Sequence, residues 1–200
     1  MAYMRFTAFY FDPAKYDDLM SLMNSLNDRF KDIAGLMAGR AARVNENRIM
    51  VAAAYNDKAS ADAADQELRG ELMSRFAAFM TEEPIIREGD VVWSINNEST
   101  LKDSDYFRFT RVVFDPSRFD EMMSAVTPSL EGFKDVAGLK RIRIARIMDD
   151  RVMAMARYGS KSEADAGTRQ VQQVLSGMAE YLTGEETLIR EGNLVWRFDK

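Results

Sequence analysis

The chain has 200 residues, 46% of them hydrophobic and 30% charged, a composition that is typical of folded globular proteins and excludes disordered and fibrous classes. Its formal net charge of −5 argues against binding to nucleic acid or to an anionic membrane, because both rely on a surplus of Lys and Arg. The sequence contains no Cys and no His, so it lacks thiolate nucleophiles, imidazole bases and the commonest ligands of zinc, iron–sulfur clusters and haem.

The same features set the expected location and partners. No apolar run approaches the roughly 18 residues that a membrane-spanning helix needs, and the first ten residues do not form a secretion signal. We therefore expect a cytoplasmic protein with no membrane association, no bound metal and no cofactor. Its expected partner is a small molecule or another protein.

The sequence repeats itself almost from end to end. Residues 3–97 align with residues 106–200 at a constant offset and without a gap, and roughly 36 of the 95 pairs are identical. The matches include Asp12-Pro13 with Asp115-Pro116, Ala34-Gly35-Leu36 with Ala137-Gly138-Leu139, and Arg87-Glu88-Gly89 with Arg190-Glu191-Gly192. The segment between the copies is polar, which is typical of a surface linker. We predict a first repeat at 1–97, a linker at 98–105 and a second repeat at 106–200.

In each copy an aromatic- and Thr-rich strand comes first, at Tyr3 to Phe11 in copy one. Asp12-Pro13 then predicts the start of a helix, because Asp caps free amides and Pro is preset in the helical φ range. Apolar residues continue at helical spacing up to Ile33, and Gly35 is a suitable stop. In copy two we expect Pro128 to break or kink this helix.

Two strands follow, at Met37 to Val44 and Arg48 to Tyr55, and the short polar segment between them predicts a hairpin. A second helix comes next, with Ser160 and Glu163 in capping-box spacing in copy two. A last strand surrounds Trp93, or Trp196 in copy two. Each copy therefore reads βαββαβ.

Two helices cover only one face of a four-stranded sheet, so an apolar second face needs a partner. The first strand has apolar residues on both faces. We therefore predict an α+β fold in which two tandem ferredoxin-like βαββαβ units pack sheet to sheet as a pseudo-dimeric α+β barrel. Such a chain forms a monomeric pseudo-dimer, and a homodimer of these chains remains open.

This element order and duplication resemble the dimeric α+β barrel superfamily, which includes antibiotic-biosynthesis-monooxygenase-like proteins. The resemblance implies a cofactor-independent monooxygenase-like enzyme acting on an aromatic or quinol substrate. Some members of that superfamily use a His that this chain lacks. Among other ferredoxin-like families, an RNA-recognition module needs stacked aromatics on its third strand, and residues Arg48 to Ala52 offer none. An amino-acid-binding regulatory pair remains open.

Arginines present in both copies are the most suggestive polar residues. Arg5 with Thr7, and Arg108 with Thr110, each lie two apart on one strand face and could hold a carboxylate, phosphate or enolate. The competing interpretation, which we favour, is that these arginines pair with Asp or Glu or project into water. Likewise Trp93, Trp196, Tyr55 and Tyr158 could line a pocket for a flat aromatic ligand, although core packing is the commoner role.

The copies differ at positions that could make a site asymmetric. Copy two carries Arg111, Arg157 and Arg197 where copy one has Ala8, Ala54 and Ser94. We therefore predict that any ligand site lies nearer these arginines.

No acid–base pair or nucleophile–base spacing emerges from the sequence. The leading hypothesis is therefore a barrel that binds a small anionic or aromatic molecule. The monooxygenase-like enzyme and a structural or protein-interaction module remain as alternatives.

Overall fold

The computed structural model describes residues 2–97 and 100–200. The chain forms two compact units, one of Met1–Val91 with Leu194–Lys200 and the other of Val92–Asn193. These units do not coincide with the two sequence copies, because each unit includes the end of the last strand of the other copy. None of the helices in the described part of the chain is long and apolar enough to cross a membrane.

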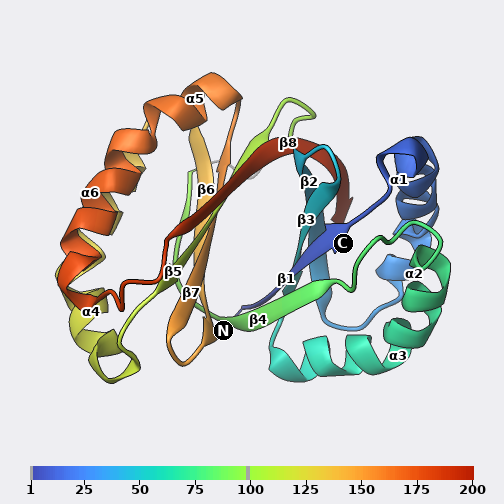
Figure 1. The fold of residues 1–200 in the computed structure, drawn as a ribbon, viewed down its shortest axis with the longest axis horizontal. Coiled ribbons are helices and arrows are strands. Elements are labelled where there is room, and N and C mark those ends of the chain that lie inside the picture. The colour runs from blue at the N-terminus through green and yellow to red at the C-terminus, as the bar shows by residue number, and fades with distance from the viewer. Residues whose placement is uncertain (1, 98–99) are drawn as a thin grey trace. The chain divides into compact units, whose positions relative to one another are not determined.

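The first unit contains a sheet with helices on one side (Figure 1). Its elements are β1 (Tyr3–Tyr10), α1 (Tyr16–Ser25), α2 (Asn27–Lys31), β2 (Leu36–Asn45), β3 (Arg48–Tyr55), α3 (Lys58–Phe76) and the beginning of β4 (Ile85–Asn96), with a short 3-10 turn at Pro13–Lys15. The end of β8 completes this sheet. The strands are hydrogen-bonded in the order β4-β1-β3-β2-β8.

The second unit repeats this plan. Its elements are β5 (Tyr106–Val113), α4 (Phe119–Glu131), β6 (Leu139–Met148), β7 (Arg151–Tyr158), α5 (Lys161–Ala166), α6 (Thr168–Met178) and β8 (Leu188–Asp199), with 3-10 turns at Pro116–Arg118, Gly132–Asp135 and Ala179–Tyr181. Its strand order is β8-β5-β7-β6-β4, so the full order of hydrogen-bonded strands closes on itself as a barrel. The predicted α+β barrel fold is confirmed.

The local signals for helix starts act as predicted. The Asp12 carboxylate accepts a hydrogen bond from the Ala14 amide, and Asp115 accepts one from the Ser117 amide. The Ser160 hydroxyl accepts from the Glu163 amide, which is the expected capping contact at the start of α5. The hairpins are also present, because β2 pairs antiparallel with β3 and β6 with β7.

The first helix of each copy differs from its prediction. Pro128 lies inside α4 and does not break it, because the helix continues to Glu131 although the proline lacks an amide donor. The corresponding helix of copy one, which lacks proline, ends at Ser25, and α2 starts at Asn27. The intervening Leu26 amide donates to the Met23 carbonyl three residues back, a tight turn that separates α1 from α2.

The predicted linker is only partly described, because residues 98 and 99 lie outside the described residues. Its last residue, Asp105, is not on the surface: it is 1% exposed and forms an ion pair with Arg157 at 3.3 Å. The Lys102 amide also donates to the Asp105 carboxylate. These contacts tie the end of this segment to β7.

Replacing a glycine by alanine should have opposite effects on stability at two positions of unit 1, Gly35 and Gly70. Gly35 has φ +74°, and a Cβ there would lie 2.2 Å from the Ser60 hydroxyl, whereas a Cβ on Gly70 in α3 would meet nothing within 4 Å. We expect Gly35→Ala to destabilise the protein by about 1–3 kcal/mol. Gly70→Ala should stabilise it by about 0.5–1 kcal/mol through helix propensity. Urea unfolding of both variants would check this, and equal signs would contradict it.

Candidate functional site

Arg5 of β1 is the first of the predicted ligand residues, and it is already paired. It lies directly opposite Glu88 of β4, and its Nε donates to the Glu88 carboxylate at 2.6 Å. Its other nitrogens donate to Asp65 and to the Ala61 carbonyl of α3, each at 3.3 Å. Burial lowers the pKa of Arg5, but the hydrogen bond to Glu88 and the nearby acids raise it by more, so the guanidinium stays charged.

Arg108 makes the equivalent contacts in unit 2. It lies opposite Glu191, donates to that carboxylate through Nε, and donates to the Ala164 carbonyl at 2.9 Å. A hydroxyl takes the place of the Asp65 carboxylate here, because Arg108 donates to Thr168 Oγ1 at 3.0 Å. Both units therefore hold an arginine, partly buried in unit 1 and buried in unit 2, between a strand carboxylate and the first turns of a helix.

The arginines specific to copy two are also ion-paired. Arg111 contacts Glu185 at 2.5 Å, and Arg157 contacts the buried Asp105. Each of the four predicted ligand arginines thus already has a carboxylate partner, as the competing interpretation expected. Their role in ligand binding remains a prediction.

Unit 1 contains a cavity of about 440 Å³ between the helix-covered face of the sheet and helices α1 to α3. This volume lies within the roughly 300–1,000 Å³ range that is usual for ligand pockets. Its walls are mostly apolar, with Phe9, Leu72, Phe76 and Trp196 among them. Several polar groups also line the cavity, and some of them surround Arg5. They are Arg5, Thr7, Tyr55, Asp65, Arg69 and Glu83.

Trp196 forms one wall, although it belongs to sequence copy two. The end of β8 brings it into unit 1, where it is 7% exposed and its Nε1 donates to the Met23 carbonyl at 3.1 Å. The Phe30 ring packs edge-on against it, with centroids 5.7 Å apart. The indole covers Gly39, where a Cβ would lie 2.7 Å from the ring. Trp196 is therefore both a core residue and a wall of the cavity.

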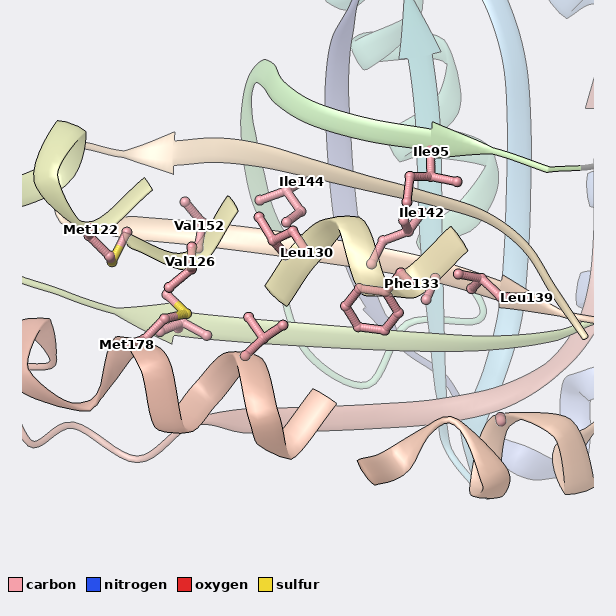
Figure 2. Close-up of a cluster of buried hydrophobic side chains, with 14 of the residues drawn as sticks. Ile95, Met122, Val126, Leu130, Phe133, Leu139, Ile142, Ile144, Val152 and Met178 are labelled. Atoms are coloured by element: carbon pink, nitrogen blue, oxygen red, sulfur yellow. The ribbon is translucent and has the colours of Figure 1, made fainter. Parts of the chain in front are cut away.

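The equivalent region of unit 2 is almost filled, with a void of only about 60 Å³. Ile142 occupies the position of Gly39 and is buried with Leu130, Phe133 and Val152 in one apolar cluster (Figure 2). The Trp93 side chain packs against the same cluster and lines neither cavity. Thr110 and Tyr158 line only the small void.

Aromatic side chains account for the difference between the units. In unit 1 the Phe9 and Phe76 rings meet edge to face, with centroids 5.6 Å apart, between β1 and the end of α3. In unit 2 the smaller Val112 aligns with Phe9. The backbone contacts that follow α3 and α6 are 102 residues apart in the two copies, so the counterpart of Phe76 is Met178, which lines the small void. There the helices approach closely, and Gln170 of α6 donates to the Ser129 carbonyl of α4. We attribute the open space of unit 1 to the contact between the Phe9 and Phe76 rings, which separates β1 from the end of α3.

Two cavity residues were missed by the sequence analysis, Asp65 and Arg69. They lie four residues apart on α3 and form an ion pair at 2.7 Å, and Asp65 also receives the hydrogen bond from Arg5. The aligned residues of copy two are Thr168 and Gln172, both uncharged. The sequence does contain a signal for these two residues, because they are charged in copy one and uncharged in copy two. Charged residues on a helix are normally solvent-exposed, so this difference did not indicate a cavity.

Tyr55 supplies the neutral hydroxyl of the site. Burial raises the pKa of Tyr55, an effect that the nearby Arg5 only partly offsets. The phenol therefore remains protonated at neutral pH. Among residues 2–97 and 100–200, no three acidic side chains gather closely enough to hold a metal ion.

The larger cavity lies away from the position that the copy differences predicted. Neither Arg111 nor Arg157 nor Arg197 lines it, whereas Arg5, Thr7, Tyr55 and Trp196 do. The prediction considered only gains of charge in copy two. A further difference between the copies is the replacement of Gly39 by Ile142, which adds volume where the cavity would be.

Comparison with solved structures supports the fold. An anthrone oxidase-like protein matches at 15% identity and TM-score 0.75 over 99% of this chain and 93% of its own. Proteins described as candidate monooxygenases from Fusobacterium nucleatum (10% identity, TM-score 0.79, covering 100% and 94%) and Lactobacillus acidophilus (7%, 0.77, covering 99% and 96%) match as well. No protein-family model and no curated protein sequence matches the chain. At these identities the likeness establishes the fold alone.

Gly39 gives a direct test of how the Trp196 wall is held. We expect Gly39→Ala to displace the indole and to destabilise the protein by about 1–3 kcal/mol through overpacking. In a Trp93→Phe background, where Trp196 is the one remaining indole, its emission should shift to the red. An unchanged spectrum and unchanged stability would contradict the contact.

Proposed function

We propose that unit 1 binds a flat, largely apolar small molecule in the cavity between its sheet and helices. The observation that carries this proposal is the contrast in volume, about 440 Å³ in unit 1 against about 60 Å³ in unit 2. Both units derive from the same repeated sequence. Unit 2 shows that side chains can fill this region almost completely. The retention of the cavity in one unit is therefore best explained by a ligand.

The lining of the cavity indicates the shape and chemistry of that ligand. The aromatic rings of Phe9, Phe76 and Trp196 favour a planar partner, because ring contacts add to the free energy of burying apolar surface. The polar groups Thr7 and Tyr55 can orient one edge of it through hydrogen bonds. The ligand-binding roles of Arg5, Thr7, Tyr55 and Trp196 are part of this proposal.

A second candidate function is the cofactor-independent oxygenation of an aromatic or quinol substrate. It is favoured by the names of the similar structures, an anthrone oxidase-like protein and two candidate monooxygenases, and by the Asp65 carboxylate in the cavity lining, which could take up a proton. In such a reaction a methylene next to a phenolic ring becomes a carbonyl: O₂ supplies its oxygen atom and leaves the second atom in water with the two hydrogens. Oxygen uptake with a bound ligand that carries such a group would support this candidate. Binding without uptake leaves the binding function.

The binding proposal predicts that copy-two residues should close the cavity. We expect the double variant Phe9→Val with Phe76→Met to lose at least about tenfold in affinity for any flat aromatic ligand of the wild-type protein, because both aromatic rings that line the cavity between β1 and α3 are removed. A thermal-shift screen with naphthalene derivatives, quinols and aromatic amides would find the ligand. Titration calorimetry would then compare the two proteins.

Tyr16→Phe provides the matched control. It also introduces the residue of copy two, Phe119, but Tyr16 does not line the cavity. The control should bind like the wild type. Equal affinity of wild type and double variant would place the ligand elsewhere. The absence of any ligand across the panel would overturn the proposal and favour a structural or protein-interaction role.

A further inference from the structure

The copies differ in charge at one place within the cavity lining. Arg5 and Glu88 of unit 1 have exact counterparts in Arg108 and Glu191, so this pair belongs to the shared scaffold. Asp65 and Arg69 have no charged counterparts, because Thr168 and Gln172 stand in their place. The extra ion pair thus occurs only in the unit that has the large cavity.

Asp65 is not needed to satisfy the buried arginine. In unit 2 the Thr168 hydroxyl accepts the corresponding hydrogen bond from Arg108 at 3.0 Å, and Glu191 provides the charge. In unit 1 the bond from Arg5 to Asp65 is longer, at 3.3 Å, while Arg69 contacts Asp65 at 2.7 Å. The side chain of Asp65 is 26% exposed, so part of its carboxylate remains accessible.

The charges around the cavity leave no surplus for an anion. The lining includes two cations, Arg5 and Arg69, and two anions, Asp65 and Glu83. Glu88 adds a further negative charge through its bond to Arg5. A carboxylate ligand would have to displace an existing acid from one of the arginines and would be repelled by the acid that remained.

We propose that the Asp65–Arg69 pair reads an uncharged ligand edge that carries a hydrogen-bond donor beside an acceptor, such as a carboxamide or lactam, and that it disfavours carboxylates. The donor of such an edge meets the Asp65 oxygen, and its carbonyl meets an Arg69 N–H. This inference rests on the proposed binding function and narrows its ligand class from flat, largely apolar molecules to uncharged aromatic ones that carry such an edge.

The matched probes are 2-naphthamide and 2-naphthoate, which share one ring system and differ in the charge of one edge. Titration of the 200-residue chain should give an affinity for the amide at least about tenfold higher than for the carboxylate, because leaving a ligand charge beside Asp65 unpaired is unfavourable. The assay is run at low salt and repeated at physiological salt, since screening weakens charge effects at accessible groups.

Asp65→Thr tests the residue itself. It introduces the side chain found in unit 2, which still accepts a hydrogen bond from its arginine, and it leaves Arg69 without its acid. We expect naphthoate to bind more tightly to this variant and the preference for the amide to vanish or reverse. Arg69→Gln also introduces the residue of copy two and should weaken amide binding several-fold. This variant tests the same ion pair if Asp65→Thr does not fold.

Asp62→Asn is the control for net charge. Asp62 is on the same helix, pairs with Lys58 at 2.7 Å and does not line the cavity. It removes one negative charge from α3 as Asp65→Thr does, and it should leave the preference for the amide unchanged.

The outcomes separate this inference from the function on which it rests. If neither probe nor any other flat ligand binds, the proposed function fails. If both probes bind the wild type equally, or if Asp65→Thr and Asp62→Asn change the preference to the same extent, the cavity binds ligands but Asp65 and Arg69 do not select them. Only a preference for the amide that is lost in Asp65→Thr and kept in Asp62→Asn supports the selection.

Discussion

The contact between the Trp196 ring and Gly39 is the constraint on which the cavity of unit 1 depends. The indole can cover the strand only because no Cβ stands at residue 39. Its Nε1 needs a buried acceptor, and it donates to the Met23 carbonyl in the last turn of α1, which also accepts from the Leu26 amide. In unit 2, where α4 is continuous, Ile142 fills the corresponding position and little space remains.

An arginine between a strand carboxylate and a helix carbonyl is the second feature that organises each unit. Arg5 and Arg108 make these contacts with equivalent partners, which identifies them as parts of the scaffold. Because Glu88 and Asp65 neutralise the positive charge of Arg5, this arginine attracts an anionic ligand only weakly. The positions that distinguish the cavity are instead those at which the copies differ in volume or charge: Gly39, Phe9, Phe76, Asp65 and Arg69.

The sequence predicted the fold well and the site only in part, for a physical reason. Repetition, strand alternation and the caps at Asp12, Asp115 and Ser160 are local or periodic signals, and they defined the βαββαβ units and the barrel. Trp196 and Tyr55 were identified as candidate ligand residues by type. The cavity itself depends on contacts between distant elements, such as the ring contact of Phe9 in β1 with Phe76 in α3, which are 67 residues apart in the chain. No pattern within one element carries that information.

Duplication within one chain explains why a cavity and a filled core can coexist. In a homodimer every substitution occurs twice, so a residue that fills one site also fills the other. In this chain residue 142 can be Ile while residue 39 remains Gly, and residue 168 can be Thr while residue 65 remains Asp. The packed cluster of unit 2 contributes stability, whereas unit 1 tolerates a void that burial alone would remove. Because the last strand of copy two carries Trp196 into unit 1, neither copy could form this cavity alone.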